Sequence, residues 1–203
     1  SSTVASFKKK KLTDSQLATK HLPLTLTRLN LSRNHLTHRS TPLLLPLISL
    51  ISLNISENQI NDHHLETLFQ SITSFPNLTE LNLSQNLISN IGAIHILAIR
   101  LLHNPIPHLN LRGNQIGDTG AIAISTAFAQ TPITATCPSD TILSVNLARN
   151  NITCPGCEIL LNLLSVSLHH FIITLNGNPG YENNIDFQQR HHTTSIQLQV
   201  QHM

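Results

Sequence analysis

The four residues Cys-Pro-Gly-Cys at positions 154–157 are the arrangement in this sequence that could most directly do chemistry. Two cysteines separated by two residues occur in redox-active pairs and in zinc sites, and a thiol at a helix start can have a lowered pKa. Cys137 or the histidine doublet 169–170 could supply further zinc ligands. A second such cysteine pair is missing, however, and Cys157 falls where other repeats place a small or apolar residue. We therefore predict no metal ion, no cofactor and no disulfide here, with Cys157 buried and Cys154 more accessible.

Two further kinds of chemically active side chain stand in clusters. The run Lys8–Lys11 could contact phosphate or acidic lipid, but it is shorter than the usual basic tail. The histidine doublets 63–64, 169–170 and 191–192 could bind a metal ion or respond to pH. Side chains of adjacent residues diverge on a helix or strand, so one doublet does not form a chelate. We predict that the lysines form a solvated end of the first repeat and that the histidines are mostly exposed.

The composition argues against several classes of partner. The 203 residues include 12 Lys and Arg against 10 Asp and Glu, and charged residues make up 11% of the chain. This balance gives no general attraction for nucleic acid or an anionic membrane, and 3% aromatic residues without Trp offer little for stacking bases. No apolar run approaches the roughly 20 residues that cross a bilayer. We therefore expect no nucleic-acid partner and no membrane insertion.

The cysteines and the glycosylation triplets both bear on the cellular compartment. Three cysteines cannot all pair within one chain, which favours a reducing compartment. Five Asn residues begin an N-x-S/T triplet, and three of them would lie on strands, where a glycan would hinder a partner. We expect a cytoplasmic protein, either in a bacterium or, for a secreted effector, in the cytosol of a host cell. The chain opens with Ser1 rather than Met, which is compatible with a removed leading segment.

One pattern, L-x-x-L-x-L-x-x-N-x-[IL], recurs along nearly the whole chain. Five near-complete copies are followed by a weaker sixth, and their Asn residues are Asn34, Asn58, Asn86, Asn114, Asn150 and Asn178. The intervals between them run from 24 to 36 residues, which is typical of stacked strand-and-return units. The longest interval contains a proline-bearing segment near 131–141 that predicts a projecting loop.

Each copy predicts a short strand with its leucines turned into a core. We expect the strands to be parallel and adjacent in the order 29–31, 53–55, 81–83, 109–111, 145–147 and 173–175. The repeated Asn should turn its amide inward, because backbone groups that leave a strand inside the protein need hydrogen-bond partners.

The return segments are predicted to be helical. The expected helices are Asp62–Ile72, Asn90–Leu102, Asp118–Ala129 and Cys154–Val166. The polar residue four after the repeat Asn is predicted to cap each helix, as Asp14, Asp62, Asn90 and Asp118 would. Pro42 and Pro46 argue against a long helix in the first return.

These elements predict a single domain, 1–203, of the α/β class: a solenoid with parallel strands on its concave face and helices on its convex face. Residues 1–23 would form a degenerate N-terminal repeat, 24–178 the core repeats and 179–203 a C-terminal cap. In the cap, Ile196–Val200 alternates apolar residues with Gln, so we predict a last parallel strand there. Tyr181–Phe187 would be a shortened return with Ile185 and Phe187 packed inward.

The repeat spacing and the segment GNQIGDTGAIAISTAF, residues 113–128, resemble the ribonuclease-inhibitor type of leucine-rich repeat over about residues 1–178. The resemblance implies recognition of another protein by the concave face and its rims. Inhibitors, immune receptors, GTPase regulators and secreted bacterial effectors of this family work in that way.

Strand register indicates which side chains face the concave surface. A central column would hold Asn30, Asn54, Asn82, Asn110, Asn146 and Thr174. We interpret its Asn side chains as repeat consensus that bridges neighbouring strands, and we expect the column two residues later, from Ser32 to Asn176, to face the same surface. The better candidates for partner contacts are the residues that the consensus does not explain: Arg28, Glu80, His108, Arg112 and Arg149.

The sequence therefore predicts a monomeric, non-enzymatic scaffold whose partner is another protein. It shows no nucleophile–base arrangement, no phosphate-binding glycine loop and no facing pair of carboxylates. One alternative is a GTPase-activating repeat protein that supplies an Arg or Asn from a rim, although such proteins usually carry a sharply charged patch and none is evident in the sequence. The other alternative is a non-catalytic fragment of a larger effector or receptor.

Overall fold

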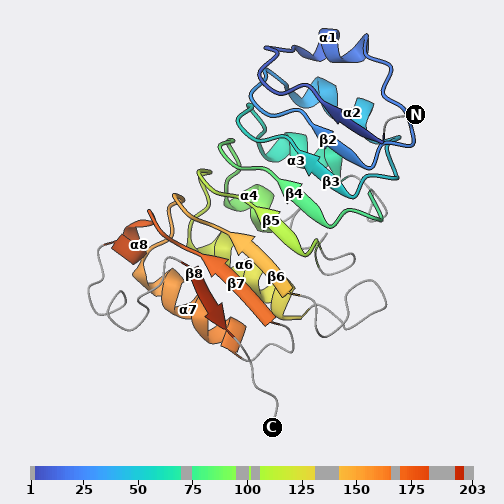
Figure 1. The fold of residues 1–203 in the computed structure, drawn as a ribbon. Coiled ribbons are helices and arrows are strands. Elements are labelled where there is room, and N and C mark those ends of the chain that lie inside the picture. Colours follow the sequence, from blue (N-terminus) through green and yellow to red (C-terminus); the bar gives the residue numbers. More distant parts are fainter. Residues whose placement is uncertain are drawn as a thin grey trace.

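The leucine-bearing segments of successive repeats form successive strands of one sheet. The computed structural model describes residues 3–69, 75–94, 101, 106–130, 142–165, 170–182 and 195–198. Within these residues the strands follow one another in sequence order, from β1 to β8 (Figure 1). Their bounds are β1 Val4–Ser6, β2 Arg28–Asn30, β3 Ser52–Asn54, β4 Glu80–Asn82, β5 His108–Asn110, β6 Ile142–Asn146, β7 His170–Thr174 and β8 Ser195–Leu198.

Strands β1 to β7 pair in parallel and in a constant register. Leu29 lies opposite Leu53, Leu53 opposite Leu81 and Leu81 opposite Leu109. The predicted order and direction of the six repeat strands are confirmed, although β2 to β5 each lie one residue earlier than expected. Strand β1, which falls in the first 23 residues, pairs with β2 in the same way.

Strand β8 departs from the prediction, because it pairs with β7 in the antiparallel direction. Phe171 lies opposite Leu198, and Thr174 lies opposite Ser195. The predicted last parallel strand at Ile196–Val200 is therefore wrong in direction. A parallel strand needs a crossover back to the starting edge of the sheet, whereas an antiparallel strand needs only a reversal of the chain. The predicted inward positions 185 and 187 lie outside the described residues.

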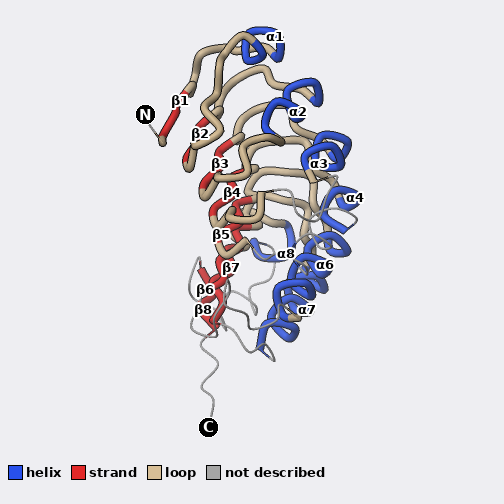
Figure 2. Tube along the Cα trace, turned by 90° about the vertical axis from the view of Figure 1, so that its right-hand side faces the viewer, coloured by secondary structure: helices blue, strands red, loops and turns tan. Residues whose placement is uncertain are grey.

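The return segments place helices on the side opposite the strands. Figure 2 shows the strands along one side, the helices along the other and the repeats following a curve that is convex on the helical side. The described helices are α1 Asp14–Ala18, η1 His38–Ser40, α2 Thr41–Leu44, α3 Asp62–Leu68, α4 Asn90–Gly92, α6 Asp118–Ala129, α7 Cys154–Ser165 and α8 Pro179–Glu182. Helix α6 has the predicted bounds, α7 is described to one residue short of its predicted end, and the proline-bearing first return contains only short helices, as expected. Helix α3 ends at Leu68, before the predicted Ile72.

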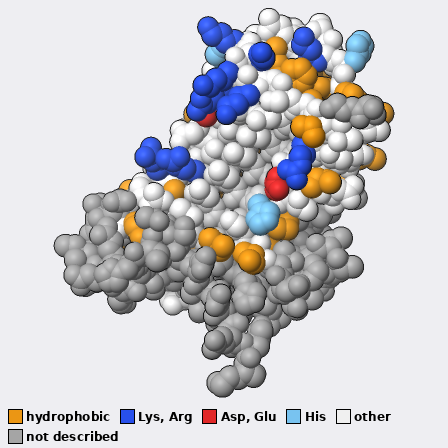
Figure 3. All heavy atoms as spheres, viewed as in Figure 1, with side chains coloured by type: hydrophobic (Ala, Val, Ile, Leu, Met, Phe, Trp, Pro, Cys, Tyr) orange, Lys and Arg blue, Asp and Glu red, His pale blue; other side chains and the backbone are white. Residues whose placement is uncertain are grey.

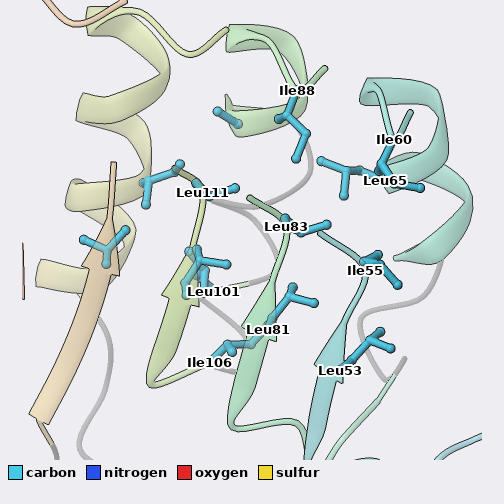
Figure 4. Close-up of a cluster of buried hydrophobic side chains, with 14 of the residues drawn as sticks. Leu53, Ile55, Ile60, Leu65, Leu81, Leu83, Ile88, Leu101, Ile106 and Leu111 are labelled. Carbon is cyan, nitrogen blue, oxygen red and sulfur yellow. The ribbon is translucent and has the colours of Figure 1, made fainter. Parts of the chain in front are cut away.

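Leucine and isoleucine side chains between the two layers form one continuous core. In the third copy of the pattern, Leu78, Leu81, Leu83 and Ile88 are each at most 2% exposed. Figure 4 shows that the corresponding side chains of neighbouring repeats stack in layers between strands and helices. Burying each such side chain contributes roughly 1.5–3 kcal/mol, so the repeats stabilise one another through shared apolar contacts.

The repeated Asn is a polar residue inside this core, and its amide joins two repeats. In the third copy, the Asn86 Nδ2 donates to the carbonyl oxygens of Leu83, at 3.0 Å, and of Ile55 in the preceding repeat, at 3.1 Å. The Asn86 Oδ1 accepts the N–H of Ile60, also in the preceding repeat, at 3.0 Å. Equivalent contacts recur from Asn34 to Asn178. The prediction that this amide turns inward is confirmed.

The residue before each repeat Asn has a left-handed backbone conformation, and so does Lys9 before Lys10 at the equivalent position of the first repeat. Its φ lies between 52° and 76° at Lys9, Arg33, Glu57, Gln85, Gly113, Arg149 and Gly177. An L-residue in this conformation costs about 1 kcal/mol, yet only two of these seven positions carry glycine. The turn directs the following side chain into the core, and the side chains of the five other residues lie in solvent at the end of the strands.

A second set of contacts joins the repeats on the helical side. Asp62 Oδ1 accepts the N–H of Ser89 in the next repeat at 2.9 Å, and Asp62 Oδ2 accepts its hydroxyl at 2.5 Å. Asp118 makes the same two contacts with Thr153. A Cβ at Gly92 would lie 2.3 Å from Asp62 Oδ1, so the glycine leaves room for this carboxylate.

These contacts correct the predicted caps. Asp62 and Asn90 occupy the first helical position, and the preceding residues, Asn61 and Ser89, are the N-caps whose side chains accept backbone N–H groups. Asp14 likewise follows the N-cap Thr13 and instead accepts the N–H of Thr37 in the next repeat. The predicted capping residues therefore connect repeats rather than terminate their own helices.

Replacing Asn86 by Ala should destabilise the protein by about 3 kcal/mol or more, because buried carbonyl and N–H groups of two repeats lose their partner. Asn82→Ala is the matched control, since the Asn82 Oδ1 bonds only within its own repeat, to the N–H and hydroxyl of Ser84. This variant should lose about 1 kcal/mol. Urea denaturation measures both, and equal losses would contradict the inter-repeat role of Asn86.

Truncation after Glu182 should promote self-association, because removal of β8 leaves the outer edge of β7 open to pairing with another chain. Light scattering and thermal melting of the shortened and full chains measure the effect. An unchanged melting temperature together with a monodisperse monomer would show that β8 does not protect this edge.

Candidate binding surface

The concave strand face contains a shallow hollow of about 360 Å³ across β3 to β6. It is lined by Ser52, Leu53, Asn54, Glu80, Leu81, Asn82, His108, Leu109, Asn110, Ser144 and Asn146. Figure 3 shows this face with few charged or apolar side chains at its centre. The hollow is therefore mainly polar and uncharged, with ionisable side chains on one side of it.

The Asn column in this hollow bonds locally. Asn54 Oδ1 accepts the N–H of Ser56 at 3.1 Å and its hydroxyl at 2.8 Å, and Asn82 makes the same contacts with Ser84. Asn30, Asn110 and Asn146 each accept the N–H two residues later. The expectation that these side chains bridge neighbouring strands is wrong, because the turn that ends each strand brings a backbone N–H within reach of the side chain.

The column two residues later does not face the concave surface throughout. Ser32 is 2% exposed, Ser56 5% and Ala148 1%. The strands have ended before these positions, so the alternation of side chains that a strand imposes no longer applies. Arg112, in the same column, is half-buried.

Three of the predicted contact residues come together where the strands begin. Arg28, Glu80 and His108 share one register position on β2, β4 and β5, with Ser52 between the first two. Arg28 Nη1 lies 3.3 Å from Glu80 Oε2, across the small Ser52 side chain. Both side chains of this ion pair are about half exposed, so they remain available to a partner.

The other two predicted residues, Arg112 and Arg149, lie where the strands end. Arg112 follows β5, and Arg149 follows β6 in the left-handed position before Asn150. The structure therefore divides the five predicted residues between two opposite margins of the concave face.

An ion pair that the sequence analysis missed lies at the same margin as Arg112 and Arg149. Arg33 Nε lies 2.6 Å from Glu57 Oε1, and both residues precede a repeat Asn. Their spacing of one repeat, with opposite charge, is the signal that could have identified the pair.

The margin where the strands begin also exposes apolar side chains. Leu24 is 63% exposed, Ile48 59% and Ile142 49%; the first two lie in loops that lead into β2 and β3, and Ile142 begins β6. Figure 3 shows apolar side chains on this side of the face and Lys and Arg gathered along the other. The two margins thus offer different chemistry.

The Cys154–Cys157 segment begins helix α7, and its two thiols differ in environment. Cys157 is fully buried and Cys154 half-buried, as predicted. Burial, together with the nearby Asp118, Cys154 and Glu158, raises the pKa of the Cys157 thiol to about 12. A thiol that stays protonated near neutral pH is a poor nucleophile, so Cys157 acts as a core residue. Cys137 lies outside the described residues.

The other predicted clusters have mixed outcomes. His63 is exposed, but His64 is buried because its ring packs at the start of α3 beside Asn61. In the part of the chain that the structure describes, no three His, Cys, Asp or Glu residues are grouped to hold a metal ion. None of its helices has the length and apolarity needed to span a membrane.

Family models of the leucine-rich repeat match residues 25–47 and residues 76–97 and 105–125. These segments contain β2, β4 and β5 and begin the returns that follow them. With the parallel sheet and outer helices, the chain folds as a leucine-rich repeat solenoid of the α/β class. No curated protein matches the chain.

Two solved structures are similar to parts of this chain. An internalin, inlF from Listeria monocytogenes str. 4b F2365, is 19% identical with a TM-score of 0.46, over 77% of this chain and 43% of that chain. The structure of PEPR1-AtPEP1 is 15% identical with a TM-score of 0.37, over 77% of this chain and 23% of that chain. This chain therefore spans less than half of the length of either protein.

Thiol labelling in a Cys137→Ser background should modify Cys154 well before Cys157, because Cys157 is buried and its raised pKa keeps it protonated. Mass spectrometry after iodoacetamide treatment at pH 8 measures the order. Rapid labelling of Cys157 in the folded protein would overturn its assignment to the core.

The raised pKa of Cys157 also makes the free energy of unfolding depend on pH. The unfolded chain loses the thiol proton at lower pH than the folded protein does, so the stability present below about pH 9 is lost as the pH rises toward 12.

Proposed function

We propose that this chain is a protein-interaction module that binds a partner protein through its concave face and both margins. The observation that carries the proposal is the position of Glu80 in the lining of the polar hollow, with His108 on the neighbouring strand β5 and Arg28 two strands away on β2. Glu80 and His108 line the hollow, and all three side chains reach solvent. A partner can therefore contact fixed charges and a hydrogen-bonding floor at the same time.

The exposed apolar residues at the same margin support a protein partner. Leu24, Ile48 and Ile142, which precede or begin the strands, would contribute apolar contacts, and protein interfaces combine apolar and charged residues. The residues that line the hollow include no Phe, Tyr or Trp, which favours a protein over a single-stranded nucleic acid.

We also propose the finer assignments that the sequence suggested. The repeats are of the ribonuclease-inhibitor type, which is supported by the 12-residue helices α6 and α7 on the convex side. The protein is a non-enzymatic, monomeric scaffold in the cytoplasm, either a bacterial effector or a regulatory leucine-rich repeat protein similar to NLR-type immune receptors. The five contact residues are Arg28, Glu80, His108, Arg112 and Arg149.

Replacing Glu80 by Arg and His108 by Glu should weaken partner capture at least tenfold, because the first change reverses a charge in the lining of the hollow and the second introduces a negative charge there. The matched control is Glu66→Arg with His63→Glu, which makes the same substitutions on the outer helix α3, where both side chains are exposed. Quantitative pull-down from candidate host and bacterial lysates, followed by mass spectrometry, compares the two variants with the parent chain.

A partner retained by the parent and the α3 control but lost from the concave variant supports the proposal. Equal capture by all three proteins would place the interface elsewhere. Circular dichroism should show the same melting temperature for both variants within a few degrees, because every substituted side chain is at the surface.

A further inference from the structure

The charges of this chain are unevenly distributed along the sequence. Residues 1–50 contain eight of the 12 Lys and Arg residues but only one of the 10 acidic residues, Asp14. A net charge of +2 therefore conceals a strongly basic N-terminal part and an acidic remainder. Such asymmetry indicates an anionic partner for the basic part.

The solenoid brings two further cations, Arg112 and Arg149, to the same edge, beyond two repeats that carry none there. In the first six repeats, the segment from two residues before to one after the Asn position turns at the end of the strand, and its exposed side chains lie at one edge of the concave face. We name this edge the cationic margin; it consists of residues 8–11, 32–35, 56–59, 84–87, 112–115 and 148–151. Its cations are Lys8, Lys9, Lys10, Lys11, Arg33, Arg112 and Arg149, and its one acidic residue is Glu57.

The backbone keeps these side chains in a defined row. Lys9, Arg33 and Arg149 all hold the left-handed conformation before the core position. The Arg149 side chain lies across the next repeat, since a Cβ at Gly177 would be 2.7 Å from Arg149 Cγ. Among the described ion pairs, Arg33 is the only cation of this margin that has an acidic partner. Most of the positive charge of the cationic margin is therefore uncompensated.

We propose that the cationic margin binds an acidic, extended segment of the partner protein that runs across the repeats. Neighbouring strands lie about 4.8 Å apart, so the five steps from Lys9 to Arg149 span about 24 Å. An extended segment of about seven residues covers that distance. Carboxylates spaced along it would meet Lys8–Lys11 at one end and the Arg112–Arg149 pair at the other.

The composition of the margin favours a protein segment over the other anionic polymers. Its described residues include no Phe, Tyr or Trp on which bases could stack. Leu87 is its one large apolar side chain, and the row follows the edge of a curved surface, which fits a flat bilayer poorly. Extended carboxylate-bearing chains require neither stacking nor insertion.

The inference rests on the proposed function but is tested separately from it, with a fluorescein-labelled Glu-Ser repeat peptide of about twelve residues as the probe. Two variants of the cationic margin, called the rim variants below, each remove two charges. One is Lys9→Gln with Lys10→Gln, and the other is Arg112→Gln with Arg149→Gln. The matched control, Lys20→Gln with Arg39→Gln, removes two exposed cations that lie outside the margin, after α1 and in η1. Fluorescence anisotropy at low and physiological salt gives the dissociation constants.

Each rim variant should bind the peptide about tenfold more weakly, the control less than twofold, and binding by the parent should weaken as salt rises. Equal losses in the rim and control variants would reduce the effect to net charge and overturn the proposal. A loss confined to the Lys9–Lys10 variant would show that the peptide does not reach Arg112 and Arg149, and would overturn a site that runs across the repeats. Tighter binding of a labelled oligouridine, or of phosphatidylserine vesicles, than of the peptide would assign the margin to nucleic acid or to membrane instead.

The two proposals fail in different ways. A partner whose capture depends on Glu80 and His108 but not on the rim residues would leave the interaction module standing and remove the acidic-segment inference. Peptide binding that persists in the Glu80→Arg variant, with no captured partner, would leave the acidic-segment inference standing and remove the proposed interaction through the concave face.

Discussion

Each repeat Asn holds a buried amide between two strands, and the arrangement of the repeats depends on it. The amide donates to carbonyl oxygens of its own and the preceding repeat and accepts an N–H of the preceding repeat, as Asn86 does with Leu83, Ile55 and Ile60. These backbone groups leave the sheet inside an apolar core, where an unpaired group would cost about 1–3 kcal/mol. Apolar burial stabilises the stack, but the amide sets the position of each strand end relative to the next.

The surface chemistry follows from this constraint. To place the Asn inward, the residue before it takes a left-handed φ, and its side chain points outward wherever this residue is not glycine. A sequence that puts Lys or Arg at and around that position thereby obtains a row of charges. At the opposite margin, Arg28, Glu80 and His108 share a register because the strands do. Both margins thus present side chains at intervals set by the strand spacing, which suits a partner that contacts several repeats.

Much of the fold could be predicted from the sequence because its signals are periodic. The spacing of leucine and Asn identified the strands, their order, and the buried Cys157. Direction was not recoverable for β8, since the alternation around Ile196 is the same for parallel and antiparallel strands. The role of Asp62 was missed because an acidic residue near a helix start suits both a cap and the first turn, whereas its contact with Ser89 depends on the neighbouring repeat. The cationic margin required the register, because residues from Lys9 to Arg149 are distant in sequence.

Native-state hydrogen exchange tests the coupling between repeats most directly. The N–H groups of Leu12, Leu36, Ile60, Ile88, Ile116 and Ile152 each donate to the Asn Oδ1 of the following repeat. The account predicts that the central four exchange only through large-scale unfolding, and that Asn114→Ala accelerates exchange at Ile88 while Asn110→Ala does not. Two results would contradict this account: exchange of these amides as fast as that of amides in exposed loops, or an exchange rate of the Ile88 N–H that Asn114→Ala leaves unchanged.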